Sequence, residues 1–290
     1  MTIIPENLAI HKASSKLLKK TDIKIQEKIL FEKESDFHSI FVVENKFGRF
    51  IKYLDTYQAG YIKTKEYQGN LPYINYLLLP YLMKKNIKDV LFIGFGSGIV
   101  VNQYEAIFKN LKRIDIVDIE ENIFSVAEKY FNFKKSEKIN FYLQDALVFL
   151  KTIKKKYDLI IADVAGNIGI DERFISIDYL NLVKSHLKKD GIFVSNMPSS
   201  SDILNKKNKF VQNLIRNYKD VFKNIDLYSG KTSNKIYYKT FFDIDEDVFD
   251  VTNLILISSD KKYILSKDYS VFKKISVKIE PYINDLVLLN

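Results

Sequence analysis

Residues 89–98 read DVLFIGFGSG, and this stretch decides the fold. Residues 89–94 have the composition of a buried strand, and residues 99–110 carry apolar side chains at helical spacing. The turn between them holds three of the ten glycines of the chain, Gly94, Gly96 and Gly98. Glycines let a backbone approach a ligand closely, and a helix N-terminus offers free N–H groups. The stretch therefore predicts a strand, a ligand-binding turn and a helix.

Outward from this unit, strands and helices alternate over the middle of the chain. Further strands of five to seven residues are predicted over residues 113–118, 139–143, 157–163 and 191–196. Helices are predicted over residues 71–83, 121–130, 146–153, 175–187 and 207–218. Apolar strands separated by helices are typical of a parallel sheet covered on both faces.

The two ends of the chain have a different pattern. Residues 23–32, 37–44 and 48–54 alternate partially and are separated by turn-like breaks, which predicts antiparallel strands. Residues 224–228, 237–242 and 254–258 are predicted to add antiparallel strands at the edge of the large sheet. We expect a β-rich domain over residues 1–68 and an α/β domain over residues 69–290, with no assignment for the last twenty residues.

The composition of the chain argues against a membrane protein, a secreted protein and a metalloprotein. The chain has 290 residues, 47% of them hydrophobic, and no apolar run near the roughly 20 residues that a membrane helix needs. Its first residues lack the apolar core of a secretory signal, so a cytoplasmic protein is expected. The absence of cysteine and the wide spacing of the three histidines exclude thiolate sites and argue against any metal site.

The net charge of +9 does not indicate a nucleic-acid partner. Only four of the 45 basic residues are arginine, and bidentate contacts with phosphate or guanine favour arginine. Lysine runs such as residues 154–156 are best interpreted as solvated faces. We therefore expect neither nucleic acid nor membrane as a partner.

Acidic residues follow three of the predicted strands. The strand before the glycine turn, residues 89–94, is counted as the first. The second, third and fourth strands end at Asp118, Asp145 and Asp163. Ligands of open α/β sheets bind at these carboxyl ends. Asp118 is placed to accept hydrogen bonds from ribose hydroxyls, and Asp145 to meet an adenine amino group. A helix cap for Asp118 or Asp145, and a turn role for Asp163, remain open alternatives.

The order of these features favours a Rossmann-like class I S-adenosylmethionine-type fold. A nicotinamide enzyme would more often have the G-x-G-x-x-G pattern, and position 99 is Ile. The chain also has no outstanding His or Lys for proton handling in hydride transfer.

Between residues 29 and 198 the chain resembles the spermidine synthases, the polyamine aminopropyltransferases, and their bacterial spermidine synthase-like relatives. The resemblance rests on residues 30–38, 45–49, 57–60 and 189–194, on Pro72-Tyr73, and on the glycine turn with its three acids. It implies transfer of an aminopropyl group from decarboxylated S-adenosylmethionine to a primary amine, without a metal, by an enzyme that forms a homodimer.

The same resemblance implies roles for individual residues. Asp163 matches the general base of the family and would contact the acceptor amine together with Tyr73. The donor would be held by His38, Gln58, Gly94, Gly96, Ser97, Gly98, Asp118, Asp145 and Ala146.

Four positions depart from the family pattern. Ser97 and Gly166 stand where spermidine synthases carry acids, and Ile74 and Asn75 replace the polar residues that follow the tyrosine. An acid at position 97 would attract the ammonium of the decarboxylated donor and repel the carboxylate of ordinary S-adenosylmethionine. Transfer of a methyl or other alkyl group from ordinary S-adenosylmethionine is therefore an alternative, and a non-catalytic relative is another.

Overall fold

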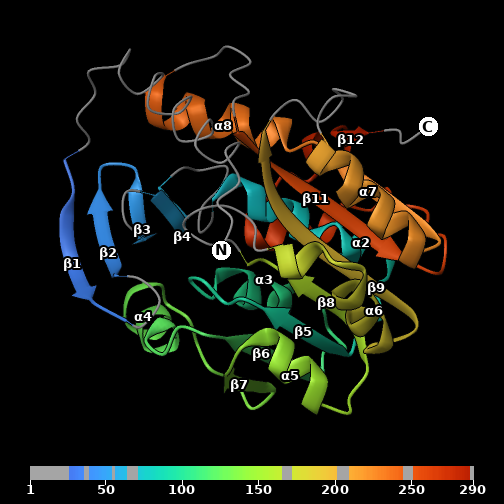
Figure 1. The fold of residues 1–290 in the computed structure, drawn as a ribbon. Helices are drawn as coiled ribbons and strands as arrows, with labels where there is room; N and C mark the ends of the chain where they lie inside the picture. The colour runs from blue at the N-terminus through green and yellow to red at the C-terminus, as the bar shows by residue number, and fades with distance from the viewer. Residues whose placement is uncertain are drawn as a thin grey trace.

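The computed structural model describes residues 26–35, 39–53, 56–63, 71–164, 172–200, 209–243 and 251–287. They form a four-stranded sheet in the order β1-β2-β3-β4 and an eight-stranded sheet in the order β12-β10-β11-β9-β8-β5-β6-β7. Figure 1 shows the small sheet beside the larger α/β body. The predicted Rossmann-like α/β class with a small β-rich part is confirmed, whereas the proposed boundary at residue 68 lies outside the described residues.

The small sheet is an antiparallel meander. Its strands are β1 (Lys28–Lys33), β2 (Ile40–Asn45), β3 (Gly48–Tyr53) and β4 (Thr56–Ile62). The first three coincide with predicted strands. The fourth was not predicted, because Ala59 and Gly60 weaken its β pattern. Pairing with β3 nevertheless makes it a strand, and this strand carries Gln58.

Five parallel strands form the centre of the large sheet. They are β5 (Asp89–Ile93), β6 (Arg113–Asp118), β7 (Ile139–Leu143), β8 (Tyr157–Ala162) and β9 (Leu187–Ser200). Helices α3 (Ile99–Ile107), α4 (Ile123–Tyr130), α5 (Ala146–Thr152) and α6 (Ile177–Ser185) connect them, as predicted. The strand order reverses between β5 and β8, which is the topological switch point of the sheet.

The two faces of this sheet bury separate apolar clusters. On one face Val90 and Phe92 pack with α3 and α4, and on the other Leu91 and Ile93 pack with α5, α6 and α7 (Lys209–Val221). The alternation follows from the two-residue repeat of a strand. Every residue of β8 is buried, as expected for a strand covered on both sides.

Antiparallel strands extend the sheet beyond β9. β11 (Val251–Ser259) pairs with β9 and with β10 (Asn224–Tyr228), and β12 (Leu286–Val287) pairs with β10. The predicted strands at residues 224–228 and 254–258 are thereby confirmed. None of the helices in the described ranges is both long and apolar enough to cross a membrane.

The predicted strand at residues 237–242 is wrong, because this segment lies in helix α8 (Lys231–Phe242). Its aromatic and β-branched composition favours a strand. However, Ser233, Tyr237 and Phe241 recur at helical spacing, and the ring of Phe241 lies 5.6 Å from that of Phe50 in the small sheet. Packing against a distant part of the chain therefore overrides local propensity.

The predicted α-helix at residues 71–83 is a 3-10 helix, η1 (Pro72–Leu78), followed by the short helix α2 (Pro80–Met83). Pro80 has no backbone N–H, and its ring would clash with the carbonyl of Tyr76 in a continuous α-helix. The chain instead closes a tighter turn in which the Leu79 N–H donates to Tyr76 O. Near the C-terminus, where the sequence predicts no element, the structure has η3 (Ser270–Ile275), α9 (Glu280–Ile283) and β12.

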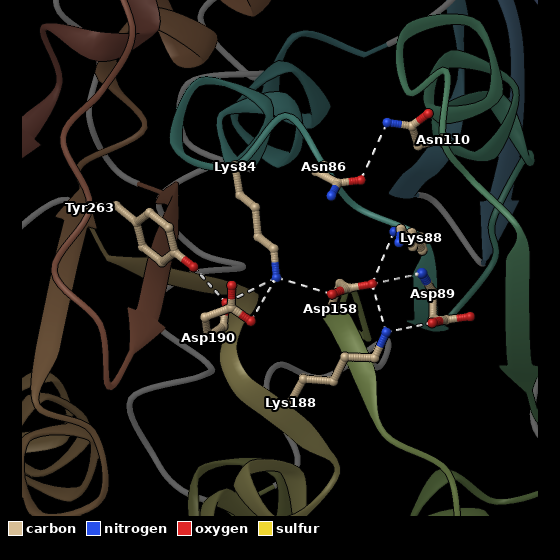
Figure 2. A network of polar contacts seen from close by, with 9 residues as sticks. All are labelled: Lys84, Asn86, Lys88, Asp89, Asn110, Asp158, Lys188, Asp190 and Tyr263. Atoms are coloured by element: carbon tan, nitrogen blue, oxygen red, sulfur yellow. Dashed lines mark hydrogen bonds and ion pairs between the residues drawn. The ribbon is translucent and has the colours of Figure 1, made fainter.

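A network of ion pairs lies at the amino-terminal ends of the parallel strands, opposite the predicted site (Figure 2). Asp158, 6% exposed, accepts hydrogen bonds from Lys84 Nζ at 3.0 Å, from Lys188 Nζ at 2.9 Å and from the backbone N–H groups of Lys88 and Asp89. Burial alone would raise the pKa of Asp158, but these donors outweigh burial and lower the pKa to about 2. The carboxylate therefore joins the starts of β5 and β8.

We expect Asp158→Asn to lower the free energy of unfolding by about 2–4 kcal/mol at pH 7, since it removes one partner of a buried charged network. The folded-state pKa lies below the unfolded value, so this stabilisation is present above about pH 4 and is lost as the pH falls toward 2. Urea unfolding at several pH values measures the difference between wild type and variant.

The matched control is Asp268→Asn, which breaks an exposed ion pair with Lys85. The side chain of Asp268 is 55% exposed and that of Lys85 is 50% exposed. That change should cost less than about 1 kcal/mol. A difference between wild type and Asp158→Asn that stays constant from pH 7 to pH 2 would contradict the assigned charge state.

Candidate active site

Backbone hydrogen bonds hold three strand ends together at the switch point. The Gly94 N–H donates to Val117 O of β6 at 2.9 Å, and the Asp163 N–H donates to Ile93 O of β5 at 2.9 Å. The glycine turn and the ends of β6 and β8 are therefore adjacent, as the sequence predicts.

The glycine turn approaches the end of β8 so closely that a side chain would not fit. Gly94 has φ +89°, and a Cβ atom built on it would lie 2.4 Å from the carbonyl oxygen of Asp163. Gly96 and Gly98 also have positive φ, and Ser97 is buried between them. At Gly94 the turn therefore packs backbone against backbone at the end of β8.

Asp118 lies directly beside this turn. Its Oδ2 accepts the Phe95 N–H at 2.8 Å, and its Oδ1 accepts the Glu120 N–H at 2.9 Å. Burial raises the pKa of Asp118 to about 6, against the lowering effect of the backbone hydrogen bonds. Asp118 does not cap helix α4, whose N-cap is Asn122. The Ile119 N–H also contacts this carboxylate, and since a carboxylate has about four acceptor positions, one is left for a ligand.

Asp145 has the capping role that the sequence left open. Its Oδ1 accepts the N–H groups of Leu147 at 2.8 Å and Val148 at 3.1 Å, at the start of α5. Its Oδ2 lies 3.5 Å from Nη1 of Arg173. Ala146, the first residue of α5, is 9% exposed. The cap occupies one oxygen only, so the interpretation of Asp145 and Ala146 as adenine contacts stays a prediction.

Asp163 follows β8 and accepts two side-chain hydrogen bonds. Tyr73 OH of η1 lies 3.1 Å from its Oδ2, and Asn196 Nδ2 of β9 lies 2.8 Å from its Oδ1. Burial raises the pKa of Asp163, while the hydrogen bonds from Asn196 and Tyr73 oppose that rise. The Tyr73 hydroxyl is also 3.3 Å from the backbone carbonyl of Gln58. The structure thus brings Asp163, Tyr73 and Gln58 together.

Asn196 was not predicted as a site residue. In β9 it follows Ser195, the last residue that pairs with β8, and it is the first amide side chain after the run of residues 191–195. The same strand-end rule that selects the acids would have selected it. His38 and Gly166 lie outside the described residues.

The two departures after Tyr73 belong to the core. Ile74 is 6% exposed and Asn75 is fully buried, with Asn75 Nδ2 donating to Tyr282 OH at 2.7 Å. Asn75 is therefore tied to the C-terminal segment. Among the described residues, no three His, Asp or Glu side chains are grouped so that they could hold a metal ion.

The sequence of this chain matches a known protein family. The spermine/spermidine synthase domain matches residues 77–234, which is more than half of the chain. The chain belongs to the spermine/spermidine synthase family. The resemblance noted in the sequence is thereby confirmed.

Individual relatives of this spermine/spermidine synthase family member are distant. A polyamine aminopropyltransferase of Buchnera aphidicola subsp. Acyrthosiphon pisum is 29% identical over 175 residues, which are 58% of this chain and 59% of the relative. One from Clostridium botulinum is 29% identical over 181 residues, 61% of each chain. A spermidine synthase from Thermotoga maritima has a TM-score of 0.63 at 14% identity and covers 94% of this chain and 96% of its own, which supports the fold.

We expect Gly94→Ala to destabilise the protein by more than about 2 kcal/mol, because positive φ is strained for alanine and its Cβ would clash with the Asp163 carbonyl. Gly96→Ala is the matched control: its Cβ would meet only the Ala59 side chain, at 3.1 Å, so a loss of about 1 kcal/mol is expected. Chemical denaturation measures both, and equal losses would show that the close approach to β8 is not a constraint.

Proposed function

We propose that this protein transfers an aminopropyl group from decarboxylated S-adenosylmethionine to a primary amine such as putrescine. The observation that carries the proposal is the half-buried pair of Asp163 and Tyr73, 3.1 Å apart, beside the glycine turn of a spermidine synthase-family domain. The names of the curated relatives, polyamine aminopropyltransferases, support the same chemistry.

In this proposal Asp163 is the catalytic residue. An alkylammonium with a pKa of about 10 is mostly protonated at neutral pH and cannot attack carbon. Asp163 orients the amine and takes up its proton while the nitrogen forms a bond to the carbon beside the sulfonium. The carbon–sulfur bond breaks, and its electron pair stays on sulfur, which becomes a neutral thioether. Tyr73, whose hydroxyl contacts Asp163, borders the acceptor.

We infer that the donor binds at the carboxyl ends of the parallel strands. Asp118 would accept a hydrogen bond from the ribose hydroxyls, and Asp145 with Ala146 would contact adenine. Gly94, Gly96, Ser97 and Gly98 would border the donor as a backbone wall, with Gln58 at the mouth. His38 remains a predicted donor contact outside the described residues. The main work of such a site is to align two substrates and exclude water.

The direct test is mass analysis of the products after incubation with each donor and a panel of primary amines. An aminopropylated amine and the thioether nucleoside are expected with the decarboxylated donor. Donor binding without any product would indicate a non-catalytic relative. A cytoplasmic location, a homodimer and a reaction without a metal are further expectations from the family, and sedimentation tests the dimer.

Asp163→Asn should reduce turnover by about 10²–10⁴, the range for loss of a positioned proton acceptor, with donor affinity near its original value. Raising the pH should partly restore this variant, because more amine is then already deprotonated. Asp145→Asn is the comparison variant and should weaken donor binding instead. Steady-state kinetics and calorimetry with the donor separate the two effects. Full activity of Asp163→Asn would remove it from the catalytic role.

A second candidate is transfer of a methyl or other alkyl group from ordinary S-adenosylmethionine. It is favoured by the buried Ser97, since the glycine turn has no acid there to repel the donor carboxylate.

The substitution Ser97→Asp should therefore shift the ratio of affinities toward the decarboxylated donor by at least about tenfold, since it adds an anion in a partly dry site. Calorimetry with both donors measures the ratio. Ser97→Asn, which adds similar bulk without charge, should leave the ratio unchanged. The same ratio in wild type and Ser97→Asp would exclude position 97 as the discriminating residue.

A further inference from the structure

Two asparagines form a chain of hydrogen bonds that ends on Asp163. Asn253 Nδ2 of β11 donates to Asn196 Oδ1 at 3.0 Å, and Asn196 Nδ2 donates to Asp163 Oδ1 at 2.8 Å. Asn196 pairs with Ile255 in the antiparallel ladder, two residues from Asn253. The two amides are thus diagonal neighbours on one face of the sheet.

The orientation of the Asn196 amide decides what Asp163 meets. An amide has a donating NH₂ end and an accepting oxygen end, and a rotation by half a turn exchanges them. An ionised carboxylate only accepts hydrogen bonds, so the oxygen end of Asn196 would repel it. Asn196 is 3% exposed, which leaves little water to compensate a wrong orientation. The NH₂ group of Asn253 satisfies the oxygen end and keeps it away from Asp163.

We propose that Asn253 is a positioning residue that acts through Asn196, fixing the donating amide end on Asp163 and thereby keeping this carboxylate ionised and aimed at the acceptor amine. The kinetic consequence rests on the proposed function. The hydrogen-bond order itself does not, because it concerns only Asp163 in the free protein.

The surroundings of Asp163 make this effect measurable. Burial raises its pKa, and the groups that lower it are the side chains of Asn196, from β9, and Tyr73, from η1. Within the described ranges, Tyr73 is the titratable group that faces Asp163, and no charged side chain shifts its pKa. Loss of the Asn196 hydrogen bond should therefore raise the pKa of Asp163 further.

The experiment compares neutral variants, which add no charge near Asp163. In the pH dependence of kcat/KM, we expect Asn196→Leu to move the acid limb to higher pH by about one to two units. This is the effect of losing one hydrogen bond to a carboxylate. Asn253→Leu should move it in the same direction by about one pH unit, because the amide of Asn196 is no longer fixed. The activity at the alkaline plateau and the affinity for the donor should change less than about threefold.

Two further variants separate positioning from structure. Asn253→Gln keeps a donating amide, so its acid limb should lie closer to that of the wild type than the acid limb of Asn253→Leu does. Asn224→Leu removes an amide that donates to the Ser259 carbonyl at 3.3 Å, at the opposite end of the same sheet, and should leave the profile unchanged. If Asn253→Leu does not fold, Asn253→Ala tests the same loss of the donor.

A titration of the Asp163 carboxyl carbon by NMR, without substrates and assigned with Asp163→Asn, distinguishes the two proposals. A raised pKa in both leucine variants, together with full activity of Asp163→Asn, would retain the positioning role and reject the proposed base. A raised pKa in Asn196→Leu but an unchanged one in Asn253→Leu would overturn the role of Asn253. An unchanged pKa in both would overturn the hydrogen-bond chain as a whole.

Discussion

The pairing of β5 with β6 on one side and β8 on the other is the constraint on which the rest of the structure depends. Two backbone hydrogen bonds, Gly94 N–H to Val117 O and Asp163 N–H to Ile93 O, continue the ladders past the strand ends. They bring a glycine turn within van der Waals distance of β8, so only a residue without a side chain fits at position 94. Asp118 ends β6 and Asp163 follows β8, so both are positioned by this junction.

The two ends of β8 show how one strand can hold carboxylates of opposite character. Asp158 lies at the amino-terminal end among lysines and backbone donors, and its pKa falls to about 2. Asp163 follows the other end, where it meets a tyrosine and an amide, and burial raises its pKa. Full charges nearby make the first carboxylate a structural anchor, whereas neutral donors leave the second able to exchange a proton.

Local composition was sufficient to predict the centre of the fold, and distant contacts explain what was missed. The strand, turn and helix around Gly94 could be predicted because the apolar run and the glycines that determine them lie within ten residues of one another. Helix α8 could not, because Phe241 packs on Phe47 and Phe50, nearly 200 residues earlier. The positions of Asp118 and Asp163 at neighbouring strand ends could be predicted because parallel strand ends align by topology. The link from Asn196 to Asn253 depends on the register between β9 and β11, which no local pattern encodes.

The C-terminal segment is tied to η1, the helix that carries Tyr73. Asn75 donates to Tyr282, and the Tyr76 hydroxyl donates to Asp285, which also accepts the Thr232 N–H at 2.7 Å at the start of α8. These contacts hold a 3-10 helix whose first turn carries Tyr73, the residue that contacts Asp163. A 3-10 helix has poorer hydrogen-bond geometry than an α-helix and needs such external contacts. The polar residues at positions 75 and 76 therefore anchor the same short helix that carries Tyr73.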